Sequence, residues 1–95
     1  MLEYKPINPK RLNKSQRDYL VGLFEHIKPA IAELGGEVSV QDFDLRDRFP
    51  TEGWHNLQAC LDLAIERGEA RIATETVVIK ANGSKVRGLP IVELV

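Results

Sequence analysis

Apolar residues recur every three or four positions between residues 13 and 34, which predicts an amphipathic helix packed on a core. The stripe comprises Tyr19, Leu20, Leu23, Phe24, Ile27, Ile31 and Leu34. Asn13 or Ser15 is expected to cap the helix, and Gly35-Gly36 to end it, because glycine adopts left-handed backbone angles without a Cβ clash. Pro29 lacks an amide proton, so the helix is expected to kink there or to split into two pieces.

A shorter pattern follows the two glycines. Val38 and Val40 alternate with polar residues and predict a brief strand near 37–40. Alternatively, Ser39 caps a short second helix, with Asp42 near its positive end. This helix is expected to stop at Pro50. Its expected buried residues are Val40, Phe43, Leu45 and Phe49.

A third helix is predicted over about residues 52–67, with Thr51 as its cap and Gly68 at its end. Its expected buried face comprises Trp54, Leu57, Cys60, Leu61, Ala64 and Ile65. Its expected outward face comprises Glu52, His55, Ala59, Asp62 and Glu66, flanked by Asn56, Gln58 and Leu63. The exposed side of this helix is therefore predicted to be acidic.

The last quarter of the chain is rich in Thr, Val and Ile and predicts a β-hairpin with strands over 71–80 and 85–95. Asn82-Gly83 is expected to form a type I′ turn, which needs positive φ at both residues. The expected cross-strand pairs are Lys80 with Lys85, Ile79 with Val86, and Val77 with Gly88. Pro90 donates no ladder bond, so the second strand is expected to be an edge strand or to be bulged there.

The composition indicates one small folded domain. The chain has 95 residues, 43% hydrophobic and 28% charged, which is ordinary for a globular protein with a single core. Cys60 is the single cysteine, so an internal disulfide and a cysteine-rich zinc site are excluded. No apolar run reaches the ~18 residues of a membrane span, and the first residues do not resemble a signal peptide. A cytoplasmic protein without a membrane partner is expected.

Charge is unevenly distributed, although the formal net charge is only −1. Residues 1–17 carry five cations and one acid, and residues 80–95 carry three cations and one acid. Residues 18–79 carry twelve acids and five cations. The basic ends are the main functional clue in the sequence. Residues 1–12 contain two prolines and no periodicity, so they are predicted to form an extended basic arm ahead of a domain over 13–95.

The predicted order of helix, short strand, two helices and long hairpin resembles that of a winged helix-turn-helix domain. The resemblance covers residues 14–95 and includes the turn Thr51-Glu52-Gly53-Trp54 between the second and third helices. It implies an α+β fold of three helices followed by a two-stranded β-hairpin wing, with a short third strand near 37–40. In this superfamily the third helix enters the DNA major groove, and the wing reaches the backbone or the minor groove.

This resemblance implies a set of DNA-contacting residues. The set comprises His55, Asn56 and Gln58 on the third helix, Lys80, Asn82, Lys85 and Arg87 around the wing tip, and Lys10, Arg11, Lys14 and Arg17 in or beside the arm. Amide side chains read base edges, and cations contact phosphates. The acids of the third helix depart from the pattern, because they would face phosphates. Lysines on a hairpin also have a second explanation, since they protect an edge against aggregation.

The sequence assembles no active site. His26 and His55 lie on different predicted helices and in no metal-binding pair. Cys60 lies on an apolar face, whereas a nucleophilic thiol needs exposure and positive surroundings. The acidic segment that begins at Asp42 departs from a calcium loop, because Asp47 occupies the glycine position. We expect no catalysis, no metal and no cofactor.

Two functions from different classes fit the sequence. The first is a DNA-binding regulator of transcription or replication, whose affinity is largely electrostatic. The second is a non-enzymatic interaction module, an adaptor or a homodimer, that uses the acidic third helix or the C-terminal strand over 89–95. That strand has apolar residues on both faces, so an exposed patch or an open edge is expected.

Overall fold

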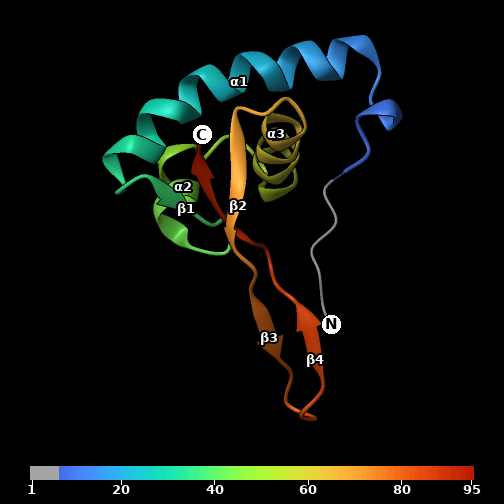
Figure 1. Cartoon of the computed structure of the whole chain (residues 1–95), viewed down its shortest axis with the longest axis vertical. Helices are drawn as coiled ribbons and strands as arrows, with labels where there is room; N and C mark the ends of the chain where they lie inside the picture. Colours follow the sequence, from blue (N-terminus) through green and yellow to red (C-terminus); the bar gives the residue numbers. More distant parts are fainter. Residues whose placement is uncertain (1–6) are drawn as a thin grey trace.

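The computed structural model describes residues 7–95, which form a small α+β domain (Figure 1). A short 3-10 helix, η1 (Pro9–Arg11), precedes the helices α1 (Lys14–Glu33), α2 (Phe43–Arg48) and α3 (Trp54–Glu66). The strands are β1 (Glu37–Val38), β2 (Ala70–Thr74), β3 (Val77–Ile79), β4 (Lys85–Arg87) and β5 (Ile91–Leu94). No helix in residues 7–95 is long and apolar enough to cross a membrane.

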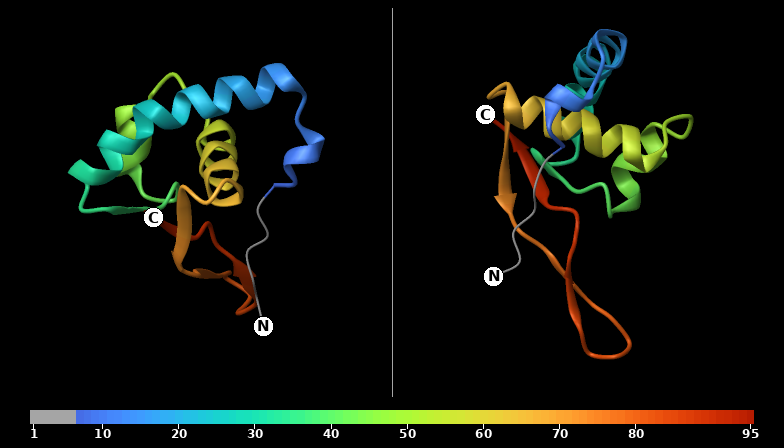
Figure 2. Two further views of the ribbon diagram at one scale, coloured as in Figure 1. Left: turned by 45° about the horizontal axis from the view of Figure 1, so that its top comes forward. Right: turned by 90° about the vertical axis from the view of Figure 1, so that its right-hand side faces the viewer.

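The five strands form two antiparallel sheets. β5 is the centre of a three-stranded sheet with the order β1-β5-β2. β3 and β4 form a separate two-stranded ribbon, which projects from the rest of the domain at one end of its long axis (Figure 1). In the right panel of Figure 2, the helices lie on one side of the three-stranded sheet, and the ribbon tip bends toward that same side.

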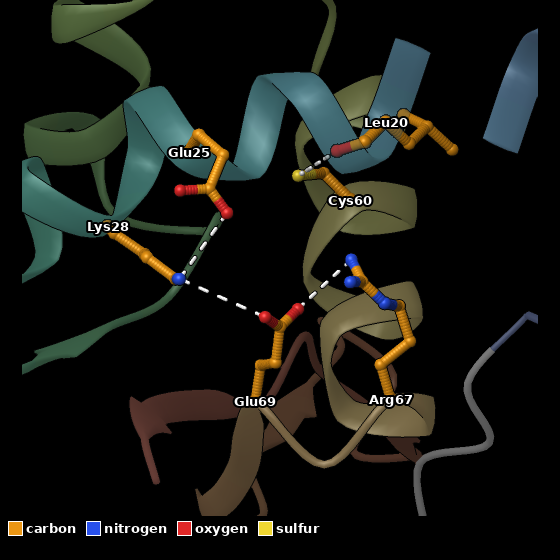
Figure 3. A network of polar contacts seen from close by, with 6 residues as sticks. All are labelled: Leu20, Glu25, Lys28, Cys60, Arg67 and Glu69. Atoms are coloured by element: carbon orange, nitrogen blue, oxygen red, sulfur yellow. Dashed lines mark hydrogen bonds and ion pairs between the residues drawn. The ribbon is translucent and has the colours of Figure 1, made fainter. Parts of the chain in front are cut away.

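The core forms where α1, α3 and the sheet meet. Its most buried side chains include Phe24, Ile27, Ile31, Val40, Leu45, Leu57, Cys60, Leu61 and Val92. The Cys60 thiol donates to the carbonyl oxygen of Leu20 at 3.2 Å, which joins α3 to α1 (Figure 3). Beside the core, Lys28 lies 3.4 Å from Glu25 and 3.8 Å from Glu69, which also pairs with Arg67 at 3.0 Å. These ion pairs connect α1 with the turn between α3 and β2.

The predicted boundaries of α1 are confirmed. Asn13 and Gln16 form a capping box, in which each side-chain oxygen accepts from the other residue's backbone amide at 2.8 and 2.9 Å. Gly35 and Gly36 follow the helix end with φ of 99° and 91°. Pro29 does not split the helix. It lies on the exposed side, where water can hydrate the carbonyl that lost its donor.

The capping and burial predictions around α2 and α3 are partly wrong. Gly53, not Thr51, is the N-cap of α3. Asp42, not Ser39, is the N-cap of α2. The Ser39 hydroxyl donates to the Leu89 carbonyl at 3.1 Å and ties the chain after β1 to the segment before β5. Phe43 is 68% exposed and packs instead under the Arg46 guanidinium, 5.0 Å from the ring centroid.

The hairpin turn differs from the predicted type I′ turn. In the loop only Gly83 has positive φ, at 83°. The Gly83 amide donates to the Lys80 carbonyl at 2.9 Å, and the Lys80 amide donates to the Ser84 carbonyl at 2.8 Å. This is a three-residue loop, a type I turn followed by a glycine bulge. The Asn82 side chain accepts from the Ser84 amide at 2.9 Å, a local bond that needs no positive φ at Asn82.

The loop shifts the strand register by one residue from the predicted one. The observed pairs are Val77 with Arg87, Val78 with Val86, and Ile79 with Lys85. Ile79 therefore shares a face of the ribbon with Lys85 rather than with Val86, because successive residues of a strand alternate between faces.

The long hairpin predicted from the sequence is interrupted near Pro90. There the Thr76 hydroxyl donates to the Leu89 carbonyl at 2.8 Å, and β2 shifts register between Ile72 and Thr74. Pro90 precedes the first residue of β5, so its missing amide proton removes no bond from the sheet. The irregularity of this ladder lies in β2 rather than at Pro90 itself, and the edge-strand alternative is wrong, because β5 is paired on both sides.

Candidate nucleic-acid interface

The β3–β4 ribbon presents the basic side chains predicted for the hairpin. Lys80, Lys85 and Arg87 are all exposed. Neither Lys80 nor Lys85 forms an ion pair with another residue of 7–95. Asn82 is also exposed, but its oxygen accepts from the Ser84 hydroxyl at 2.6 Å as well as from the amide. Asn82 therefore shapes the loop that separates the cations.

The start of α3 presents a smaller surface than predicted. His55 and Asn56 are exposed. The His55 ring lies against the ring of Trp54, with centroids 3.6 Å apart, and the Asn56 amide donates to the Glu52 carboxylate at 3.2 Å. Gln58 is only 5% exposed, so its predicted position flanking the outward face of the helix is wrong.

Asp62 overturns the prediction of a continuous acidic face on α3. It is 3% exposed, and its two carboxylate oxygens accept from the Gln58 side-chain amide at 2.9 Å and from the Ile7 backbone amide at 3.1 Å. The chain before α1 thus turns back across this side of α3 and covers it. Such a contact between residues 55 positions apart leaves no periodic signal in the sequence.

The basic arm is only partly extended in the residues that the structure describes. Pro9–Arg11 form a 3-10 turn, and residues 1–6 of the predicted arm lie outside the described residues. The four cations predicted in or beside the arm, Lys10, Arg11, Lys14 and Arg17, are exposed. Lys14 lies 3.7 Å from Asp18, which weakens its positive potential. Figure 1 shows η1 and the start of α1 at the opposite end of the molecule from the ribbon, so the two basic regions do not merge.

Tyr19 and Glu52 connect α1 to the start of α3. The Tyr19 hydroxyl donates to the Glu52 carboxylate, and this hydrogen bond raises the pKa of Tyr19 above its ordinary value. Glu52 therefore holds both Tyr19 and Asn56. An open groove of about 250 Å³ lies beside this contact. Its lining residues are Ile7, Leu12, Gln16, Tyr19, Leu20, His55, Asn56 and Ala59.

Two further observations concern chemistry at other side chains. Burial raises the pKa of Cys60 to about 12, so the thiol stays protonated near neutral pH. Within residues 7–95, no three His, Cys, Asp or Glu side chains are grouped so that they could hold a metal ion.

Comparison with known proteins adds no assignment: no protein-family model, no curated protein and no solved structure gives a significant match to this chain. Its function has to be inferred from its own residues.

Proposed function

We propose that this chain is a DNA-binding domain of the winged-helix type, with the β3–β4 ribbon as its wing. The observation that carries the proposal is the pair Lys80 and Lys85, exposed on a projecting ribbon and without an acidic partner in residues 7–95. Cations in this setting neutralise phosphates at low cost, since they need not first leave an ion pair. The helix order and the β1-β5-β2 sheet support a winged-helix arrangement.

In this proposal α3 approaches the duplex only with its first turn. His55 and Asn56 lie there, but Glu52 holds the Asn56 amide and would repel phosphates. Most of the affinity therefore comes from the backbone, with little sequence information from α3. The domain then acts without catalysis, as a regulator or accessory factor of transcription or replication.

The test is fluorescence anisotropy of a labelled random-sequence duplex, titrated with the protein at several salt concentrations. We expect micromolar binding at low salt. If three phosphates are neutralised, affinity falls about 40-fold between 50 and 200 mM salt, because each contact contributes ~0.9 to the logarithmic slope. The double variant Lys80→Glu, Lys85→Glu should lower the slope by about two units. Absence of binding at low salt contradicts the proposal.

The alternative, a protein-interaction module, has less support in residues 7–95. Burial of Asp62 interrupts the acidic face of α3. The C-terminal strand offers no open edge at Val92 and Glu93, because β1 and β2 pair with it there from both sides. We therefore do not favour a homodimer formed through this strand.

A further inference from the structure

The ribbon exposes apolar side chains as well as cations. Val77, Val78 and Ile79 are consecutive, and their exposed fractions are 49%, 40% and 67%. Because successive side chains of a strand point to opposite faces, Val77 and Ile79 share one face. Their cross-strand partners on that face are Arg87 and Lys85. One face of the ribbon thus carries an apolar row beside a basic row, about 4.8 Å apart.

This exposure is unfavourable for the isolated chain. A two-stranded ribbon is marginally stable in water, and the right panel of Figure 2 shows this one projecting beyond the helices and the three-stranded sheet. A second copy paired along β3 would bury three strand residues on each side. Stable protein interfaces use about 20–30 residues on each side, so self-association through β3 is a weak explanation.

A nucleic-acid duplex fits the mixed composition of this face. Minor-groove proteins insert single apolar side chains between base steps and place cations on the flanking phosphates. Ile79 is the most exposed of the three apolar residues, and it lies directly across from Lys85. The tip of the ribbon, Ala81-Asn82-Gly83, has only small side chains and so permits close approach to a narrow groove.

We propose that the ribbon lies in the minor groove and inserts Ile79 as an apolar wedge, with Lys85 and Arg87 toward the phosphates, and that the duplex bends at this point. This inference rests on the proposed DNA binding. It predicts that the preferred partner is a duplex that is bent or easily unstacked, since insertion of a side chain costs least free energy where base steps separate easily.

The test compares two substitutions of one strand. In Ile79→Thr the wedge becomes polar, whereas Val78→Thr changes the opposite face and is the matched control. Both replacements are β-branched, so both suit the strand. Each protein is mixed with a duplex of about 30 base pairs that carries a fluorescence donor and acceptor at its two ends. Anisotropy of a singly labelled duplex reports binding separately.

We expect wild-type protein and Val78→Thr to raise energy transfer on binding, and Ile79→Thr to lose at least half of this rise while it keeps the salt slope. A duplex with a two-base mismatch should bind wild-type protein at least ~5-fold more tightly than the matched duplex, because its bending cost is lower. For Ile79→Thr this preference should shrink to less than ~2-fold.

Four outcomes overturn the inference in distinguishable ways. If wild-type protein binds without a change in energy transfer, insertion of Ile79 is contradicted, whereas the proposed function stands. Equal losses in Ile79→Thr and Val78→Thr show a general effect on the ribbon. A wild-type dimer that Ile79→Thr converts to monomers, measured by sedimentation, assigns the strand to protein contact. Absence of wild-type binding removes the proposed function together with the wedge.

Discussion

The Asp62 carboxylate fixes the segment before α1 against α3. It is almost completely buried and accepts from both Ile7 and Gln58. A buried carboxylate with hydrogen-bond partners is held firmly in position, because loss of these bonds would leave buried polar groups unsatisfied. This one side chain therefore decides which part of α3 remains available to a ligand.

Replacement of Asp62 by Ala should lower the free energy of unfolding by about 1–3 kcal/mol, because the Gln58 and Ile7 donors lose their acceptor. Urea denaturation measures this change. Trypsin should also cleave faster after Lys10 and Arg11, which lie next to the released segment. Glu66→Ala, an exposed change one turn further along α3, is the control and should stay within ~0.5 kcal/mol. Equal stability of the two variants would contradict the role of Asp62.

The Tyr19–Glu52 hydrogen bond can be tested by spectroscopy, because it changes the titration of the phenol. The bond raises the pKa of Tyr19 above 10.0, so its stabilising effect is complete below pH 10 and is lost as pH rises through the folded-state pKa. Absorbance titration of the phenol should show one tyrosine with an elevated pKa, and Glu52→Gln should lower that pKa. An unchanged titration curve in Glu52→Gln would refute the contact. Tyr19→Phe identifies which tyrosine gives the signal.

At the scale of elements, the ribbon is the part least supported by the rest of the fold. Its hydrogen bonds join β3 only to β4, and its loop depends on one glycine with positive φ. Local stability of this kind differs from the stability of the core, and hydrogen exchange measures the two separately.

Gly83→Ala should destabilise the ribbon by about 1 kcal/mol, because an alanine in the left-handed region strains its Cβ. Asn82→Ala should cost less, since Asn82 has no positive φ to maintain and loses only its local bonds to Ser84. Hydrogen exchange of the Lys80 amide, which donates to Ser84, reports this opening directly. If Asn82→Ala accelerates exchange more than Gly83→Ala, the loop is not the type I turn with a glycine bulge.

At the scale of the whole molecule, cations are concentrated at two separated ends. The longest extent of the domain is 40 Å, with the ribbon at one end and η1 with the start of α1 at the other (Figure 1). Screening at physiological salt acts over ~8 Å, so the two regions influence a ligand independently. A ligand that contacts only the ribbon therefore gains little from the cations near α1.

Two double variants with the same change in net charge test this separation. Lys80→Glu, Lys85→Glu should weaken duplex binding at least ~10-fold, and Lys14→Glu, Arg17→Glu less than ~3-fold, because in the proposed complex the ribbon supplies the phosphate contacts. Anisotropy titrations at one salt concentration measure both. Equal losses would mean that net charge, rather than position, governs binding.

Elements whose cause is local were predictable from the order of residues along the chain. The apolar stripe, Asn13 and Gly35-Gly36 predict α1 at nearly its observed bounds, and Val38 predicts the short strand β1. The basic hairpin was also predictable, because its composition and turn residues are contiguous in the chain. These features follow from helix periodicity, capping and β-propensity, which act over a few residues.

Tertiary structure decided the features that depend on distant neighbours. Asp62 and Gln58 are buried because the chain near Ile7 folds over them, and β5 is central because β1 and β2 flank it. The register of the ribbon differs by one residue from the predicted register. This difference follows from the loop hydrogen bonds of Lys80 and Gly83, and it places Ile79 across from Lys85 rather than Val86. Hydrophobic pattern does not specify these pairings, because packing and hydrogen bonds across the fold select among registers and faces that are locally equivalent.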